Sequence, residues 1–189
     1  LEQAKKICTH FKVDHTIINI NCLKEITESA LLDSKTEINH EQGSPPNTLV
    51  VGRNGLMARI GAIHANNLGA DCIYMGVIEV EEANSGYRDC SRKYMDIIQA
   101  GLRLDFDNRL FDIKTPIVFM TKKETLELAY QMSILDYLVE ETLSCYEGVP
   151  GIGCQKCPAC KLRNSGLKEF SLAHPDFNYS YKNEVLKDI

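Results

Sequence analysis

The chain has 189 residues, of which 44% are hydrophobic and 25% charged, and its formal net charge is −5. This length suits one ordinary domain, or one domain with a small appendage, and the composition is typical of a soluble globular protein. The acidic balance argues against a general nucleic-acid binder, and no apolar run approaches the ~18 residues that a membrane-spanning helix needs.

The first quarter of the chain begins directly in a helical pattern, because apolar residues recur at helical spacing from Leu1 to Phe11. The short, β-branched run Val13–Asn21 predicts a buried strand. A helix is expected over Leu23–Leu32. The polar stretch Asp33–Thr48, which contains Gly-Ser-Pro-Pro-Asn, predicts a loop.

The middle of the chain predicts a helix, a strand, a loop and a second helix. The first helix is expected over Asn54–Leu68, with Gly69 at its C-terminal cap. A strand follows over Cys72–Val77, and an acidic, glycine-containing loop over Ile78–Cys90. Ser91 is expected to cap the second helix, which runs to about Leu102.

The last part of the chain predicts one more strand and two helices. The strand Phe111–Pro116 ends at a proline, and Thr121 with Glu124 forms a capping box for a helix that runs to Met132. A cysteine-rich loop follows, and a final helix is expected from roughly Pro158 to Phe170.

Alternating strands and helices predict an α/β fold with a mostly parallel sheet and helices on both faces. In such sheets ligands bind at the carboxyl ends of the strands. The loops after Asn21, Val77 and Pro116 are therefore the expected places for a functional site.

Four cysteines gather in the last third of the chain: Cys145, Cys154, Cys157 and Cys160. Cys-x-x-Cys turns direct both sulfurs at a common centre, and the remaining two thiols complete a tetrahedron, which is the ligand set of a closed structural zinc site. Three glycines let the intervening loop fold back tightly. We therefore expect one structural Zn²⁺ per chain.

Two other interpretations of the cysteines compete with zinc. An iron–sulfur cluster is one, but ferredoxins usually place the fourth cysteine differently. Disulfides are the weakest, because the chain shows no signal peptide and its other cysteines are scattered among apolar segments. That pattern suits a reducing cytosol, where clustered thiols bind metal. A cytoplasmic location is expected.

A glycine, an arginine and a helix start come together at Gly52, Arg53 and Asn54. The glycine lets the backbone approach a ligand, the guanidinium offers a fixed fork of donors, and the helix start adds partial positive charge. These features suit a phosphate or a carboxylate. A plain loop-to-helix junction with a solvated arginine explains the segment equally well.

Two further segments carry side chains suited to a ligand. Asp89 could accept a hydrogen bond from a heterocycle N–H, with Tyr87 stacked on the ring; the alternative is a polar surface loop. Lys122 stands in the first turn of a helix, where the helix dipole disfavours a cation. That placement suits an anionic ligand, while an exposed lysine beside Lys123 is the commoner explanation.

These segments occur in the order found in one enzyme family, that of 7-cyano-7-deazaguanine synthase, which the chain resembles from Leu1 to about Phe170. The cysteine segment is the most specific part of the resemblance. The matching motifs are Pro46-Asn-Thr with Gly52-Arg-Asn54, Gly76-Val77, Ser85-Gly-Tyr with Asp89-Cys90, Thr115-Pro116 with Lys122 and Glu124, and Ser144-Cys-Tyr through Gly-Cys-x-x-Cys-x-x-Cys to Leu162-Arg163.

The resemblance implies an adenine nucleotide α-hydrolase-like fold of the ATP-pyrophosphatase type. Its core would span residues 1–140, a four-cysteine zinc subdomain 141–175 and a tail 176–189. It also implies conversion of 7-carboxy-7-deazaguanine and ammonia to the 7-nitrile. ATP adenylates the carboxylate, ammonia displaces AMP to give an amide, and a second activation dehydrates the amide.

The resemblance also assigns roles to residues. Arg53 and Lys122 would act as catalytic cations on the phosphate groups. The binding residues for ATP or the deazaguanine would be Gly52, Asn54, Gly76, Tyr87 and Asp89. Zinc would organise the C-terminal loop, because sulfur fills every coordination position. Mg²⁺ accompanying ATP, a homodimer, and no membrane or nucleic-acid partner are further implications.

The chain also departs from the family pattern. The pyrophosphate-binding loop Ser-Gly-Gly-x-Asp-Ser does not occur in these residues. Because Leu1 aligns with a helix downstream of that loop, we expect the loop and the first strand to lie outside this chain. Val51 and Arg88 stand where the family usually has proline, and the acidic stretch Glu79–Asn84 is longer than usual. These three departures bear on the choice of substrate.

Two alternative functions stay open on the sequence. A sibling ATP-pyrophosphatase would pass an activated deazapurine carboxylate to another amine, which the changed loop around Arg88 motivates. A non-catalytic zinc module would account for the missing pyrophosphate loop. The acidic net charge and the lack of interleaved basic and aromatic residues disfavour nucleic-acid binding by such a module.

Overall fold

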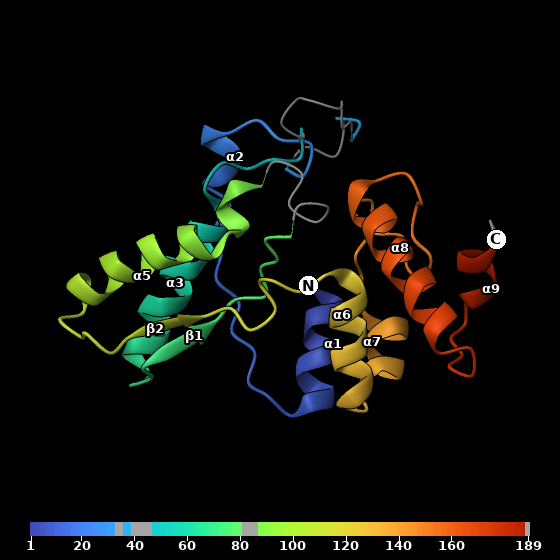
Figure 1. Cartoon of the computed structure of the whole chain (residues 1–189). Helices are drawn as coiled ribbons and strands as arrows, with labels where there is room; N and C mark the ends of the chain where they lie inside the picture. The colour runs from blue at the N-terminus through green and yellow to red at the C-terminus, as the bar shows by residue number, and fades with distance from the viewer. Residues whose placement is uncertain (33–35, 39–46, 81–86, 188–189) are drawn as a thin grey trace. The chain divides into compact units, whose positions relative to one another are not determined.

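The computed structural model describes residues 1–32, 36–38, 47–80 and 87–187. The chain forms two compact units: unit 1 comprises residues 1–28, 32–38 and 122–189, and unit 2 comprises residues 29–31 and 39–121. Figure 1 labels the α-helices and strands of both. The expected boundaries after residues 140 and 175 follow the cysteine motif instead, and they stay a prediction.

Unit 2 is a small α/β unit with one parallel strand pair. Its elements are α3 (Arg53–Asn67), β1 (Cys72–Tyr74), the 3-10 turn η1 (Arg88–Cys90), α5 (Arg92–Asp105) and β2 (Asp112–Lys114). The register places Ile73 opposite Ile113 and Tyr74 opposite Lys114. Because α5 connects β1 to β2, the pair is a β-α-β unit, as the alternation of strands and helices predicts.

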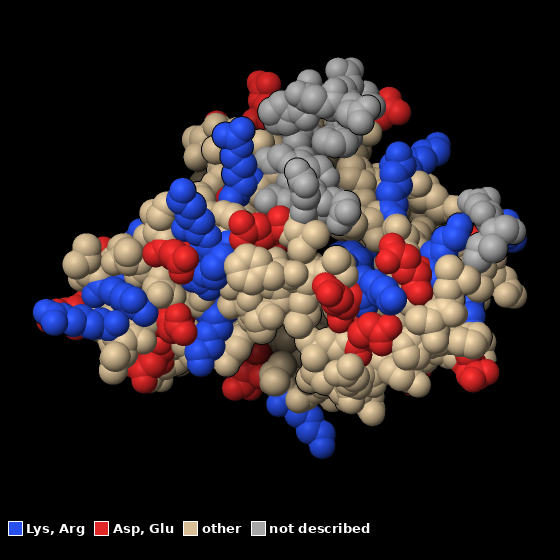
Figure 2. Space-filling model, in the orientation of Figure 1, with Lys and Arg blue, Asp and Glu red and all other residues tan. Residues whose placement is uncertain are grey.

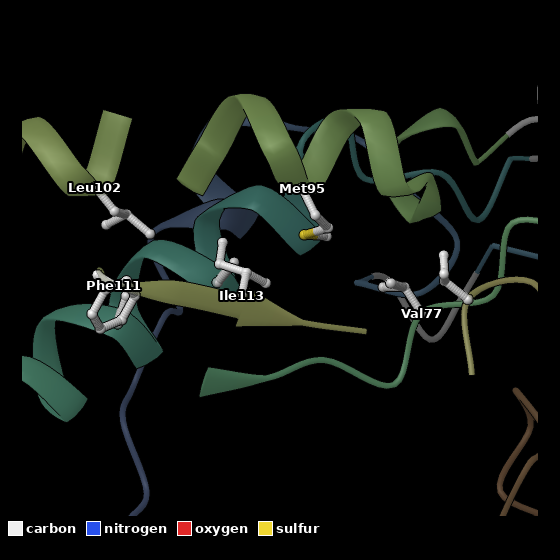
Figure 3. Packing of buried hydrophobic residues seen from close by; sticks show 8 residues of the cluster. Val77, Met95, Leu102, Phe111 and Ile113 are labelled. Carbon is white, nitrogen blue, oxygen red and sulfur yellow. The ribbon is translucent and has the colours of Figure 1, made fainter. Parts of the chain in front are cut away.

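The core of unit 2 lies between the strands and the helices α3 and α5. Side chains of α5 point toward β2 and the residue before it, as Figure 3 shows for Met95 and Leu102 beside Ile113 and Phe111. Each of these four side chains is fully buried. Burying a large apolar side chain stabilises the fold by about 1.5–3 kcal/mol. This cluster therefore fixes α5 on the strand pair.

Helices α3 and α5 cover the same face of the strand pair. Ala58 and Ala62 of α3 belong to the same core cluster as Ile113 of β2. The alternate positions Tyr74 and Lys114 point to the other face, where both are exposed. Within the described part of unit 2, the expected covering of both faces by helices is therefore not observed.

The outer edge of β2, away from β1, is hydrogen-bonded by side chains of α5. The Arg103 Nε donates to the Phe111 carbonyl at 2.7 Å, and the Arg92 Nη1 donates to the Ile113 carbonyl at 2.6 Å. The Ile113 amide donates to the Gln99 side-chain oxygen at 2.6 Å. These bonds satisfy backbone groups that a further strand would otherwise pair.

Local signals place the ends of several helices correctly. The Ser91 Oγ accepts a hydrogen bond from the Tyr94 amide at 3.1 Å, which is the expected N-cap of α5. Gly69 follows α3 with a φ of 74°, the left-handed conformation expected at a C-terminal cap. Cys157 caps the last long helix, which begins at Pro158 as predicted.

Unit 1 is helical. Its elements are α1 (Glu2–Phe11), α2 (Leu23–Ile26), α6 (Lys122–Gln131), α7 (Leu135–Glu141), α8 (Pro158–Ala173) and α9 (Lys182–Leu186). Helices α6 and α8 pack tightly, because a Cβ added at Gly166 would lie 2.6 Å from the Cβ of Lys122. Residues of α6, α7, α8 and the C-terminal segment share one core. The helix α1 contacts α7 by a stacked pair, His10 and Tyr137, with ring centroids 3.7 Å apart.

The predicted strand Val13–Asn21 is wrong. In the structure this segment pairs with none of the described strands, and Val13, Ile17 and Ile18 are 56%, 56% and 47% exposed. A β-branched run favours extended backbone, but a strand also needs a hydrogen-bonding neighbour. The helix expected over Leu23–Leu32 is shortened to the four residues of α2.

Two helices of unit 1 were not predicted. The helix α7 carries Leu135, Leu138 and Val139 at helical spacing, a signal that lies between the predicted helix ending at Met132 and the cysteine loop. The helix α9 has only five residues. Its periodicity is too short to read, and packing of Val185 into the core of unit 1 holds it.

Candidate functional site

The four cysteines of unit 1 lie around a common point. The sulfur atoms of Cys145, Cys154, Cys157 and Cys160 all lie within 4.8 Å of one another, and three of the four residues are buried. A tetrahedral ion with metal–sulfur bonds of ~2.3 Å would bring the sulfurs about 3.8 Å apart. The donor set therefore fits a single thiophilic metal ion, as the sequence predicts.

Backbone geometry builds this cluster. Gly148, Gly151 and Gly153 all have positive φ angles, between 61° and 76°. A Cβ added at Gly153 would lie 2.3 Å from the Cys160 Sγ, so that only glycine fits there. The predicted need for glycine in this loop is therefore confirmed at a specific contact.

Backbone amides donate to three of the sulfur atoms. The Cys154 amide donates to the Cys145 Sγ at 3.4 Å, the Cys157 amide to the Cys154 Sγ at 3.3 Å, and the Cys160 amide to the Cys157 Sγ at 3.4 Å. Donors of this kind stabilise the thiolates that bind a metal.

The thiols have shifted pKa values. Burial acts to raise the pKa of Cys145, but amide donors from Cys154, Val149 and Glu147 outweigh it and lower this pKa to about 7. Burial, followed by the hydrogen bond with Cys157, raises the pKa of Cys160 to about 12. A cation held by all four sulfurs would favour the ionised form of each thiol.

Unit 1 also contains a cationic pocket, defined here by Lys122, Arg163, Thr125, Ser144, Leu167 and Tyr181 among its lining residues. Its volume is about 210 Å³, and α6, α7, α8 and the C-terminal segment form its walls. Its lining combines charged, hydroxyl and apolar side chains, which suits a ligand with a charged group.

Two cations face this pocket. Burial, and then the neighbouring Arg163, lower the pKa of Lys122. Arg163 is only 9% exposed, and its Nη2 donates to the Gly151 carbonyl. Its buried Nε has no hydrogen-bond partner among the described residues. A buried cation and a partly buried cation beside it repel each other, and an anion between them would relieve that cost.

The sequence predicts Lys122 as a site residue, whereas Arg163 is not among the predicted site residues. Arg163 stands in the Leu-Arg pair that ends the cysteine motif. Its place in this motif is the sequence signal that could have indicated a functional role. Its role in the pocket depends on the packing of α8 against α6, which sequence spacing does not reveal.

The other candidate residues belong to unit 2, where several come together at the start of α3. Gly52 has a φ of 70° and precedes Arg53. The Asn54 amide donates to the Asp89 Oδ2 at 2.9 Å, and the Asn54 side chain donates to the Cys90 Sγ at 3.2 Å. Asp89 is buried. Because its Oδ2 accepts from the Asn54 amide, it serves as the N-terminal cap of α3.

Three more observations complete the unit 2 site. The Tyr87 hydroxyl hydrogen-bonds with the Thr48 hydroxyl. Burial, followed by the charge of Asp89, raises the pKa of Cys90 to about 11. Gly76 is exposed, two residues beyond β1. The motif residues Pro46, Ser85 and Gly86 and the acidic positions 81–84 lie outside the described residues.

The surface charge and the helices of the described residues were compared with what nucleic-acid or membrane binding would require. Acidic and basic side chains are interspersed on the face drawn in Figure 2, in keeping with the small net charge of −5. Among the described residues, none of the helices combines the length and apolar character that a bilayer crossing requires.

Comparison with known proteins agrees with these features. The family model described as queuosine biosynthesis protein QueC matches residues 1–171. The 7-cyano-7-deazaguanine synthase of Clostridium botulinum (strain 657 / Type Ba4) is 37% identical over 174 residues, which cover 90% of this chain and 77% of that protein. The family match includes the cysteine cluster, both cations of the pocket and the start of α3. The chain therefore belongs to the family of the queuosine biosynthesis protein QueC.

Proposed function

We propose that the protein is a ligase that converts 7-carboxy-7-deazaguanine and ammonia to 7-cyano-7-deazaguanine, using ATP. The observation that carries this proposal is the family match over residues 1–171, together with 37% identity to a protein named 7-cyano-7-deazaguanine synthase. The cysteine cluster and the cationic pocket add physical support, because both fall within the matched residues.

The reaction has two activation steps. The substrate carboxylate attacks the α-phosphate of ATP, pyrophosphate leaves, and ammonia then displaces AMP to give an amide. In the second step the amide oxygen is adenylated and leaves with AMP as the nitrile forms. Both steps release pyrophosphate, so that an enzyme of this kind needs cations where negative charge develops.

Lys122 and Arg163 are the cations that we assign to the phosphate groups. Both line the cationic pocket; burial and then Arg163 lower the pKa of Lys122, and the Arg163 Nε has no hydrogen-bond partner among the described residues. A phosphate would accept charge-assisted hydrogen bonds from both cations. We propose Lys122 as a catalytic residue and Arg163 as a binding residue.

The residues at the start of α3 are assigned to ATP and the deazaguanine. Arg53 is proposed as a second catalytic cation, with Gly52, Asn54 and Gly76 as binding residues. Tyr87 and Asp89 are proposed to contact the heterocycle. Because one Asp89 oxygen already accepts from the Asn54 amide, this carboxylate would hold substrate and helix α3 in a fixed relation.

The cofactor proposals are Zn²⁺ in the cysteine cluster and Mg²⁺ with ATP. Cys145, Cys154, Cys157 and Cys160 would hold the zinc and leave no open position for substrate, so that its contribution is to fold the loop. We further propose an adenine nucleotide α-hydrolase-like fold, a zinc subdomain over residues 141–175, a homodimer, and a cytoplasmic location.

The activity test uses the protein expressed at its full encoded length. It is incubated with 7-carboxy-7-deazaguanine, ATP and ammonium, and the products are identified by mass spectrometry. We expect the 7-nitrile, AMP and pyrophosphate. AMP formation without nitrile would indicate that the activated carboxylate goes to another acceptor, and the absence of both products would exclude the proposed activity.

The metal test is elemental analysis of the purified protein. We expect one zinc per chain, and a Cys157→Ser variant that loses zinc and melts at a lower temperature, because metal binding is coupled to folding. Cys22→Ser, an exposed cysteine outside the cluster, serves as the matched control. Iron in place of zinc, or no metal at all, would contradict the assignment.

A further inference from the structure

The segment that follows α8 packs back onto the core of unit 1. Tyr181 is 6% exposed, and its hydroxyl donates to the Val139 carbonyl at 3.0 Å. The neighbouring Ser180 bonds both carboxylate oxygens of Glu140, at 2.6 and 2.7 Å. Val185 of α9 is buried in the same cluster. These contacts anchor a segment that lies beyond the residues 1–171 matched by the family model.

Tyr181 contacts the guanidinium of Arg163. The guanidinium carbon lies 5.4 Å from the centroid of the Tyr181 ring. On another side, the Arg163 Nη2 donates to the Gly151 carbonyl in the cysteine loop. The ring also reaches Gly151, because a Cβ there would lie 3.6 Å from the Tyr181 Cδ1. The three residues therefore form one contact group beside the cationic pocket.

Such contacts restrict the orientation of a guanidinium. An arginine that binds an anion through its fixed fork must hold that fork in one plane. The aromatic face and the carbonyl of Gly151 constrain Arg163 from two directions, while its Nε keeps a free donor among the described residues. Both Arg163 and Tyr181 line the pocket that also contains Lys122.

We propose that Tyr181 is a positioning residue that holds Arg163 in the orientation in which it binds the phosphate groups of ATP. This inference rests on the proposed use of ATP in the cationic pocket. It gives the residues after α8 a part in the binding site, whereas the sequence suggested only a tail over residues 176–189.

The test compares Tyr181→Phe with Tyr181→Leu in the full-length protein. Both variants lose the hydroxyl and its bond to Val139, but only the leucine variant loses the aromatic face. We expect the Kd for ATP, measured by calorimetry, to rise about 2- to 30-fold in Tyr181→Leu relative to Tyr181→Phe, the range of a cation–π contact. We expect the KM for ATP to rise in parallel with this Kd, and the KM for 7-carboxy-7-deazaguanine to change less, because the residues assigned to the deazaguanine lie elsewhere in the chain.

Val185→Ala is the matched control, since it shortens another buried side chain of the same segment and cluster. It should lower the melting temperature and leave the Kd for ATP unchanged. Tyr181→Met replaces the leucine variant if the latter lacks a cooperative thermal transition.

The possible results separate this inference from the proposed function. Equal ATP affinities for the phenylalanine and leucine variants, or an equal loss in Val185→Ala, would overturn the role of Tyr181. A wild-type protein that binds ATP with the expected variant pattern, yet makes no nitrile, would retain this role and overturn the proposed reaction. A wild-type protein that does not bind ATP would overturn both.

Discussion

Gly153 is the residue on which the shape of the cysteine cluster depends most directly. Its φ is 76°, and an added Cβ would lie 2.3 Å from the Cys160 Sγ. Gly148 in the same loop has a φ of 73°, but nothing lies within 4 Å of an added Cβ there. A side chain at Gly148 would cost only the strain of the left-handed backbone, whereas one at Gly153 would also clash with a metal ligand.

We expect Gly153→Ala to lose most of its bound metal. Gly148→Ala should cost about 1–2 kcal/mol of stability, the strain of a side chain in the left-handed region, and should retain its metal. Gly153→Ala should be destabilised further, because Cys160 must move. Zinc content and thermal melts of both variants test this, and equal metal content in the two would contradict it.

Lys122→Met should stabilise the protein while weakening catalysis. Burial, and then Arg163, lower the pKa of Lys122, so that the folded state disfavours its charged form. The free-energy cost of this charge to folding is present at neutral pH, and it declines as the pH rises toward 10.5, the ordinary pKa of lysine. We therefore expect Lys122→Met to melt higher than wild type at pH 7, with a smaller difference near pH 10.

The loss of nitrile formation in Lys122→Met should be about 100-fold or more, the effect of removing one preorganised charge stabiliser. Lys123→Met is the matched control, because it removes the neighbouring lysine, which is not among the pocket-lining residues. Thermal melts at both pH values and product assays measure the two effects. A Lys122→Met variant that is less stable than wild type at pH 7 would contradict the conclusion that the folded state disfavours the charge of Lys122.

At the scale of elements, η1 and α3 are joined by a cap that comes from outside the helix. The N-cap position of α3 is Gly52, which has no side chain, and Asp89 of η1 supplies the missing acceptor to the Asn54 amide. A carboxylate at a helix N-terminus also interacts favourably with the helix dipole. The start of α3 therefore depends on a residue far along the chain.

Replacement of Asp89 should show this dependence. Asp89→Ala should cost about 1–2 kcal/mol of stability, the value of a lost N-cap, whereas Asp89→Asn should retain most of it because the amide oxygen still accepts. Urea denaturation of the two variants measures the difference. Equal stabilities would mean that the cap contributes nothing, and a stable but inactive Asp89→Asn would support a role of the carboxylate in substrate binding.

The elements that sequence predicts well are those with local signals. The start of α5 at Ser91, the end of α3 at Gly69 and the start of α8 at Pro158 all depend on residues within one turn of the helix end. The strand at Val13–Asn21 was wrong because its β-branched pattern does not reveal whether a neighbouring strand is present.

The same distinction applies to the candidate site. The cysteine cluster could be predicted because its four ligands lie close together in the sequence. The cationic pocket could not, since it combines Lys122, Arg163 and Tyr181 from three parts of the chain. The proximity of Lys122 and Arg163 follows from the contact of α6 with Gly166 of α8, and a single glycine carries no strong sequence signal for such a contact. Tyr181 is held beside them by its bond to the Val139 carbonyl.

At the scale of the whole molecule, the two units have separate cores. The cysteine cluster belongs to unit 1, so that removal of its metal should act there first. We expect a zinc chelator to raise amide exchange of α8 by at least about tenfold and leave α5 nearly unchanged, since local stabilities differ between cooperative units. Hydrogen exchange read by mass spectrometry measures both helices, and equal loss of protection would contradict this independence.

The bonds from Arg92, Gln99 and Arg103 to the outer edge of β2 have a consequence for assembly. An extended chain from another molecule, including a second unfolded copy, finds the Phe111 carbonyl and both backbone groups of Ile113 already bonded. Edge-to-edge aggregation through β2 is therefore blocked. An additional strand would therefore pair with β1, so that the described sheet can be extended on that side.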